Sequence, residues 1–203
     1  MLPDLLQQIN SIASIGSAKG ATLVILSHPN FANSVANKTI VNELEKHSHI
    51  TIRHLDNIYS GYQIDVVAEQ AALLEANNIV LQFPLYWYSV PASLKNWLDQ
   101  VLGFGFAYGP EGDKLKGKNI IISTTVGGPQ ESYTPLGYNH FPIAELLKPL
   151  EQTAYLAQLK WHTPIATHRC VYIPDVYNVK EEVEERATNH VKQLLQKLKE
   201  LES

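Results

Sequence analysis

Short runs of apolar, β-prone residues alternate along this chain with stretches whose apolar residues recur at helical spacing. Such runs predict buried strands, and the amphipathic stretches between them predict helices. The predicted strands are residues 22–26, 50–54, 79–83, 119–125, 157–161 and 170–173, and the predicted helices are residues 34–46, 65–76, 91–102, 143–150 and 179–201. Because alternating strands and helices favour a parallel sheet covered on both faces, we predict a doubly wound α/β domain.

The composition limits the classes of function. The chain has 203 residues, of which 45% are hydrophobic, and a formal net charge of −4. This length supports one domain with a substantial core, and the basic clusters of a nucleic-acid-binding protein are absent. No apolar run reaches the length of a membrane span. The single cysteine, Cys170, excludes an internal disulfide, which fits a cytoplasmic protein.

The first twenty residues differ from the rest of the chain. They lack the basic start and continuous apolar core of a secretory signal. We expect residues 1–20 to form an N-terminal extension, either a poorly ordered tail or a short helix that docks on a partner. Residues 21–203 then form a single domain.

Three loops each follow a predicted buried strand, at residues 28–37, 84–90 and 124–133. In an open doubly wound sheet, ligands bind at the carboxyl ends of the strands where the strand order reverses. We therefore expect these three loops to form one site, and the convergence of all three is a stronger signal than any one of them.

The first loop is predicted to bind an anion. It runs into the start of a helix, where free N–H groups and the helix dipole favour phosphate, and His28, Ser34 and Asn37 add polar groups. The simpler alternative is that Ser34 only caps the helix. The loop contains neither a Walker motif nor a dinucleotide-binding fingerprint.

The second loop carries three aromatic residues, Tyr86, Trp87 and Tyr88, between Pro84 and Pro91. Aromatic residues at the end of a strand are usually part of the core. Here the two prolines stiffen the segment, and large flat side chains at this edge would suit a large flat ligand. We interpret the loop as the wall of a flavin site, to which the backbone N–H groups of residues 85–88 would also contribute.

The third loop contains glycines that allow close approach of the backbone to a ligand. Its candidate ligand-binding residues are Thr124, Thr125, Val126, Gly127 and Gly128. Tyr133 and His140 follow it and could transfer a proton as a carbonyl substrate gains a hydride, although His140 could equally make a structural hydrogen bond. The other histidines show no metal-binding spacing, and Cys170 is expected in the core.

Together these motifs resemble one family. They are H-P-x(4)-S-x-A-N, F-P-L-Y-W-Y-S-V-P-A-x-L-K-x-W-x-D, G-F-A-Y-G, T-T-V-G-G-P-x-E-S-Y and G-Y-N-H-F. The set is similar to the flavodoxin-like NAD(P)H:quinone oxidoreductases, the DT-diaphorase-like family. It is closest to their bacterial branch, which includes the ancillary oxidoreductases of glutathione-regulated potassium efflux systems. The resemblance covers roughly residues 21–175 and implies a five-stranded parallel sheet of order 2-1-3-4-5.

The resemblance also implies an activity and an assembly. It implies a homodimer that binds FMN, with FAD as the alternative, and passes two electrons from NADPH or NADH to a quinone by a ping-pong mechanism. It places phosphate contacts on His28, Ser34, Val35, Ala36 and Asn37, and ring contacts on Pro84, Leu85, Tyr86, Trp87 and Tyr88 and on Thr124, Thr125, Val126, Gly127 and Gly128. Tyr133 and His140 match the catalytic pair, and Phe106 and Tyr108 match aromatic residues that reach the flavin of a partner subunit.

Three departures from the family pattern matter. Val126 is an extra residue in the third motif, which would shift the amides that face the flavin, and His140 lies one residue too far from Tyr133. The N-terminal extension is also unusual. The Val126 insertion and the N-terminal extension keep open an alternative function, a regulatory subunit that binds flavin or nucleotide, docks on a potassium efflux transporter at the inner face of the membrane, and has little catalytic activity.

Overall fold

The computed structural model describes residues 20–202. The expectation that the N-terminal extension is a tail or a docking helix concerns residues 1–20 and so lies almost entirely outside the described residues.

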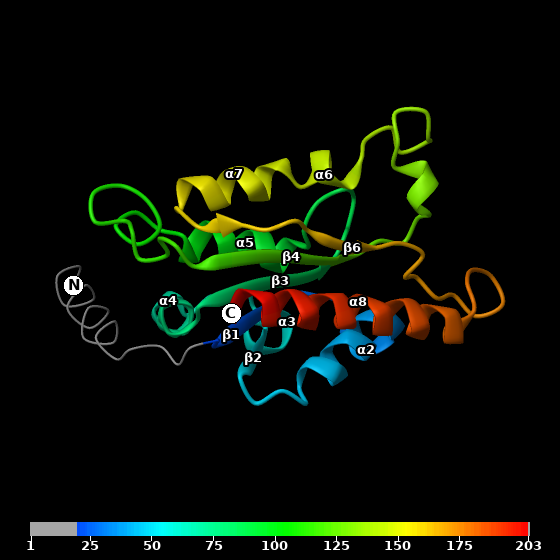
Figure 1. Ribbon diagram of the computed structural model, residues 1–203, viewed down its shortest axis with the longest axis horizontal. Coiled ribbons are helices and arrows are strands. Elements are labelled where there is room, and N and C mark those ends of the chain that lie inside the picture. Colours follow the sequence, from blue (N-terminus) through cyan, green and yellow to red (C-terminus); the bar gives the residue numbers. More distant parts are fainter. Residues whose placement is uncertain (1–19, 203) are drawn as a thin grey trace.

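The sheet confirms the predicted fold (Figure 1). Its strands run in the order β2-β1-β3-β4-β5, all pairs are parallel, and β6 pairs with β4. The strands are β1 (Thr22–Leu26), β2 (Ile50–His54), β3 (Asn78–Pro84), β4 (Asn119–Thr125), β5 (Lys160–Trp161) and β6 (Ile165–Thr167).

Of the strand predicted at residues 157–161 only the last two residues form β5, and the strand predicted at residues 170–173 is wrong. The edge position of the sheet is divided between β5 and β6, and Pro164, which has no N–H for the ladder, lies in the gap. Residues 170–173 are β-prone but form no strand, because β6 already occupies the free side of β4 at Ser123 to Thr125. The β-propensity of residues 170–173 therefore does not produce a strand, because β6 already pairs with β4 at that position.

Helices cover both faces of the sheet (Figure 1). The α-helices are α2 (Val35–Leu44), α3 (Leu55–Ile58), α4 (Val66–Glu75), α5 (Ala92–Val101), α6 (Ile143–Leu146), α7 (Lys148–Leu156) and α8 (Lys180–Glu202), and the short 3₁₀ helices are η1 (Phe31–Asn33) and η2 (Gln130–Ser132). The helix predicted at residues 143–150 is two helices, with Pro149 in the first turn of the second.

Alternating strand residues build two apolar cores. Val24, Val80 and Ile121 pack against α2 and α8 on one face. Their neighbours Leu81 and Ile122 pack against α4, α5 and α7 on the other. Because successive side chains of a strand point to opposite faces, a continuous apolar run such as Thr22–Leu26 serves both cores.

Within the described residues, no helix is both long and apolar enough to cross a membrane. In the same part of the chain, no group of three or more His, Cys, Asp or Glu side chains is placed to hold a metal ion.

Glu69 joins β2, α4 and α5 through a fully buried carboxylate. It accepts hydrogen bonds from Arg53 Nε at 2.7 Å, from the Tyr59 hydroxyl at 2.7 Å and from Trp97 Nε1 at 2.9 Å. A buried charge is tolerated when it is paired and hydrogen-bonded in this way.

We expect Glu69→Ala to destabilise the fold by about 3–5 kcal/mol, because it leaves buried donors and a partly buried guanidinium without a partner. Urea denaturation of purified protein measures this change. Glu75→Ala is the matched control, since Glu75 is exposed on the same helix, and its effect should stay within about 0.5 kcal/mol. Equal effects of the two substitutions would contradict the role given to Glu69.

Candidate functional site

The three candidate loops leave the sheet side by side. The first residues beyond their strands are still held by ladder hydrogen bonds: Ser27 N donates to Gln82 O at 3.0 Å, Leu85 N to Thr125 O at 2.8 Å, and Val126 N to Thr167 O at 2.8 Å. The carboxyl ends of β1, β3 and β4 are therefore in register, and the loops emerge at one edge.

Residues of all three loops line one open cavity of about 350 Å³. The residues predicted from the sequence that line it are His28, Ser34, Val35, Asn37, Pro84, Leu85, Tyr86, Thr125, Val126 and Gly127. Sequence reasoning missed Asn30, Asn33, Cys170, Val171 and Tyr172, which also line it. The last three belong to the segment wrongly predicted as a strand.

One end of this cavity is rich in hydrogen-bond donors. Ser34 caps α2, its Oγ accepting from Asn37 N at 3.1 Å, and the first turn of α2 has no acidic residue. The first N–H groups of a helix have no partner within the helix, so this end suits an anion. The Asn37 side chain donates to Ser34 Oγ at 3.2 Å and to Thr125 Oγ1 at 3.0 Å, which joins the first and third loops.

His28 lies beside this end and is neutral at ordinary pH. Burial lowers its pKa to about 4, although the nearby Asp56 carboxylate acts in the opposite direction. Asp56 instead accepts a hydrogen bond from the His28 backbone N–H at 2.7 Å. His28 can therefore shape the loop and offer a neutral hydrogen bond, but it brings no positive charge to the site.

The aromatic loop is a tight hairpin turn. Tyr86 and Ser89 exchange backbone hydrogen bonds of 3.0 and 2.9 Å, and the two residues between them have positive φ, 46° for Trp87 and 63° for Tyr88. Positive φ at both central positions marks a type I′ turn, which normally uses Asn or Gly and strains bulky residues. The turn leaves Trp87 92% exposed, and the Tyr88 hydroxyl donates to Asn139 Oδ1 at 3.0 Å.

The extra residue Val126 is absorbed into the sheet edge. It is fully buried, and its carbonyl accepts from Cys170 N at 3.0 Å. The two glycines then begin the loop proper. A Cβ on Gly127 would lie 3.0 Å from Val171 Cγ2, and one on Gly128 would lie 3.3 Å from the Tyr133 ring. The chain passes closely here, as glycine permits.

His168 is the imidazole that packs against Tyr133. The two ring centroids are 5.2 Å apart, and His168 Nδ1 lies 3.2 Å from the Gly128 carbonyl, to which it donates. His140, the predicted partner of Tyr133, is exposed and has a positive φ of 60°. Burial raises the pKa of Tyr133, so its hydroxyl keeps its proton. The family motif predicts His140 as the partner of Tyr133, whereas no local sequence pattern indicates His168.

Other predicted residues lie outside this cavity lining. Ala36 is buried in the core between α2 and the sheet, and Thr124 is fully buried. Trp87, Tyr88 and Gly128 directly follow lining residues in the sequence, but they do not line the cavity themselves. Phe106 is 4% exposed and packs in the core of its own chain, whereas Phe104 and Tyr108 are 70% and 41% exposed. Of the two aromatic residues expected to reach a partner, Tyr108 has the exposed surface to do so.

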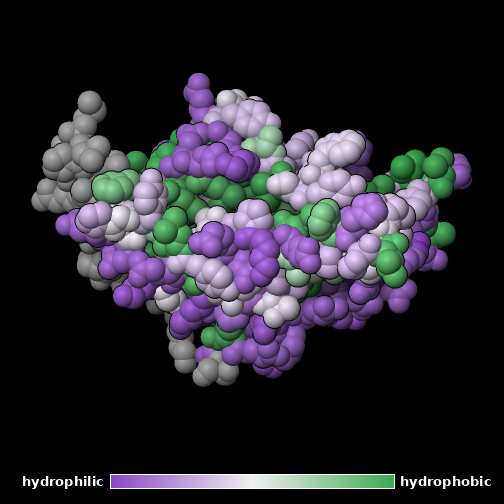
Figure 2. All heavy atoms as spheres, turned by 90° about the horizontal axis from the view of Figure 1, so that it is seen from above, coloured by the Kyte–Doolittle hydropathy of each residue, from purple (hydrophilic) through white to green (hydrophobic). Residues whose placement is uncertain are grey.

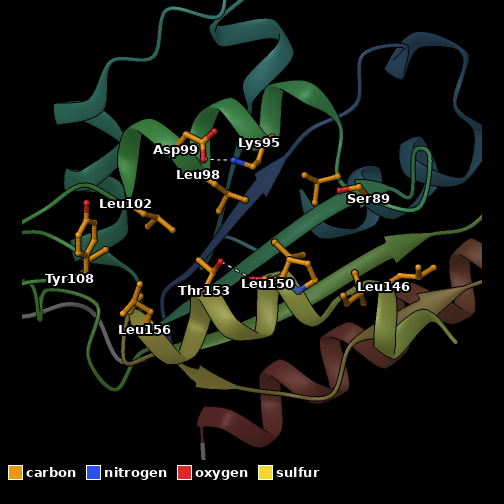
Figure 3. A pocket seen from close by; sticks show the side chains of 15 residues that line it. Ser89, Lys95, Leu98, Asp99, Leu102, Tyr108, Leu146, Leu150, Thr153 and Leu156 are labelled. Atoms are coloured by element: carbon orange, nitrogen blue, oxygen red, sulfur yellow. Dashed lines mark hydrogen bonds and ion pairs between the residues drawn. The ribbon is translucent and has the colours of Figure 1, made fainter. Parts of the chain in front are cut away.

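A second cavity, of about 300 Å³, lies between α5 and α7 (Figure 3). Leu98, Leu102, Leu146, Leu150 and Leu156 give it an apolar lining, with Ser89 and Tyr108 also at its wall. Lys95 pairs with Asp99 on the α5 side. Figure 2 shows the surface on the α7 side, where apolar areas are exposed between hydrophilic groups.

Comparison with known proteins gives consistent results. The family model described as "Flavodoxin-like fold" matches residues 21–198. An uncharacterized NAD(P)H oxidoreductase of Bacillus subtilis, YdeQ, is 40% identical over 85% of both chains. The ancillary protein KefF of the glutathione-regulated potassium-efflux system of Klebsiella aerogenes is 40% identical over 75% of this chain and 85% of its own.

Two crystal structures extend the comparison. General stress protein 14 of Treponema denticola, solved in complex with FMN, is 34% identical and has a TM-score of 0.79 over 89% of this chain and 98% of its own. A NADPH-quinone reductase of P. pentosaceus is 29% identical and has a TM-score of 0.72 over 85% of this chain and 96% of its own. The chain therefore belongs to the flavodoxin-like NAD(P)H:quinone oxidoreductase family.

Proposed function

We propose that this protein binds FMN in the cavity formed by the three loops and catalyses two-electron reduction of a quinone by NADPH or NADH. The observation that carries the proposal is the convergence of His28, Ser34, Asn37, Tyr86 and Thr125 on one cavity of about 350 Å³ at the carboxyl edge of the sheet. One end of that cavity offers donors for a phosphate, and Tyr86 brings the aromatic turn to its lining.

The side chains of the site fit this cofactor. The start of α2 with Ser34 would hold the phosphate, and Tyr86 with its neighbours in the aromatic turn would wall the ring. The backbone of Gly127 and Gly128 would approach the ring edge closely. FMN, bound in the Treponema relative, is preferred to FAD.

When bound, the flavin would supply the redox chemistry, which is hydride transfer from the nicotinamide to the quinone. The protein positions the reactants and handles the proton. In the net reaction NAD(P)H, a proton and a quinone give NAD(P)⁺ and a hydroquinone. Tyr133 keeps its hydroxyl proton near Gly128 and would donate it to an oxygen that gains charge. Nicotinamide and quinone would occupy the same place in turn, which makes the cycle ping-pong.

We also propose that the protein is a homodimer whose subunits meet beside the aromatic turn. Trp87, Phe104 and Tyr108 are exposed, and Ser89 and Tyr108 lie at the wall of the apolar cavity between α5 and α7. A second copy covering this face would bury that apolar surface, which a monomer leaves in water.

A second candidate function rests on the relationship to KefF. The protein would act as an ancillary subunit that docks on a potassium efflux transporter from the cytoplasmic side, with or without turnover. Co-purification with such a transporter from detergent-solubilised membranes supports this role. A protein that turns over quinones and is never retained by the transporter argues against it.

Steady-state kinetics test the proposed cycle. With NADPH and benzoquinone varied together, we expect parallel double-reciprocal lines, because one substrate must leave before the other binds. Protein stripped of flavin should be inactive and should recover its activity with FMN. Intersecting lines, or absence of turnover with FMN bound, would rule out the proposed cycle.

We expect Tyr133→Phe to lower kcat about 100-fold while leaving FMN affinity nearly unchanged, because the substitution removes a proton donor and keeps the ring. Stopped-flow rates of quinone reduction and the Kd for FMN measure the two effects. Tyr138→Phe is the control, since Tyr138 lies on the same segment and is 71% exposed. If both variants keep wild-type rates, Tyr133 has no part in proton transfer.

A further inference from the structure

A continuous chain of buried polar side chains connects α8 with the donor-rich end of the cavity. The donor–acceptor distances along it are 2.6 Å from His190 Nε2 to Ser123 Oγ, 2.5 Å from Ser123 Oγ to Gln82 Oε1, and 2.8 Å from Gln82 Nε2 to Asn37 Oδ1. Asn37 Nδ2 then reaches both Ser34 and Thr125. We call His190, Ser123, Gln82 and Asn37 the buried polar chain.

These four side chains lie where apolar residues would normally pack. His190, Ser123 and Gln82 have no exposed surface and Asn37 is 1% exposed. Gln82 and Ser123 are direct partners in the β3–β4 register and share their face with Val80 and Ile121, in the core beneath α2 and α8. Buried polar groups are costly unless each one is hydrogen-bonded, so the geometry of the chain is tightly specified.

The direction of each hydrogen bond follows from the orientation of the Gln82 and Asn37 side-chain amides. The single proton of the Ser123 hydroxyl goes to Gln82 Oε1, so its oxygen must accept a proton from His190 Nε2. Burial lowers the pKa of His190 to about 4, so its ring is neutral and has one donor and one acceptor. His190 is therefore the Nε2–H tautomer, and the Thr167 hydroxyl donates to its Nδ1 at 2.8 Å.

The same direction decides what the cavity presents. Ser34 Oγ accepts from the Asn37 backbone and side chain, and Thr125 Oγ1 accepts from the same side-chain amide. Both hydroxyl protons are then free to point into the cavity, which Ser34 and Thr125 line. Two extra donors beside the start of α2 favour a phosphate.

The opposite direction would reverse this preference. If His190 carried its proton on Nδ1, Ser123 would donate to Nε2, both amides would turn over, and the Ser34 and Thr125 hydroxyls would donate to Asn37 Oδ1. The cavity would then face lone pairs, which repel an anion. The tautomer at one end of the buried polar chain and the polarity of the hydroxyls at the other end are thus coupled.

We propose that His190 is a positioning residue that, through the buried polar chain, makes Ser34 and Thr125 hydrogen-bond donors and so selects a phosphorylated flavin over one without phosphate. The proposal rests on FMN as the occupant of the cavity. His190 itself lies on α8 and does not line the cavity.

Nitrogen NMR of ¹⁵N-histidine-labelled protein tests the tautomer directly. We expect the Nε2–H form for His190, identified among the eight histidines by the signal that His190→Phe removes. The measurement is made without ligand and with FMN. An Nδ1–H tautomer in both states would overturn the proposal, and this outcome does not depend on whether the wild type binds FMN.

Flavin affinities test the consequence. His190→Phe removes the donor to Ser123, and we expect it to weaken FMN binding about tenfold while riboflavin, which has no phosphate, changes less than about threefold. His190→Gln restores a donor that can reach Ser123, so it should recover most of the FMN preference. Fluorescence quenching of each flavin gives the two Kd values, and circular dichroism checks that the variants fold.

Parallel weakening of FMN and riboflavin in His190→Phe would show a purely structural role and overturn the proposal. So would an FMN preference that does not change. If His190→Phe does not fold, Thr167→Val replaces it, since this change removes the donor to Nδ1 and should also reduce the FMN preference. A wild type that binds neither flavin would instead refute the proposed function.

Discussion

The parallel ladder at the carboxyl edge of the sheet is the constraint on which the site depends. The hydrogen bonds from Ser27 to Gln82, Leu85 to Thr125 and Val126 to Thr167 hold the last residues of neighbouring strands in register. Without that register, the three loops would not face one cavity. The ladder also explains how the chain tolerates Val126, because an additional residue that pairs with the segment after β6 extends the edge and leaves the glycines beyond it.

Polar residues inside the core give this edge its chemical character. Asn37 ties the first loop to the third, and Gln82 and Ser123 continue the connection across the sheet to His190. A core of Val and Leu at these positions would be easier to bury but would leave the Ser34 and Thr125 hydroxyls free to point either way. The hydrogen bonds among these groups offset the free-energy cost of burying amides and an imidazole, and they also fix the direction in which each hydroxyl donates.

In the aromatic turn, too, the local backbone preference of the residues gives way to the position that the fold requires. Trp87 and Tyr88 occupy backbone conformations that favour glycine or asparagine, and the reciprocal hydrogen bonds between Tyr86 and Ser89 hold them there. Strain of this kind persists where the surrounding structure imposes it and is concentrated at functional sites. Trp87, which is 92% exposed in the single chain, is where we expect a ligand or a second subunit to be in contact.

The sequence by itself determined the alternation of strands and helices, the cap Ser34, and the order of the three loops, because these depend on local periodicity and on side chains within a few residues. Only the tertiary structure decided the division of the sheet edge into β5 and β6, the burial of Phe106, the packing of His168 against Tyr133, and the link from His190 to the cavity. Each of these depends on which surface another segment already occupies. Segments far apart in the chain compete for these pairing and packing positions, so no local sequence pattern predicts which segment occupies them.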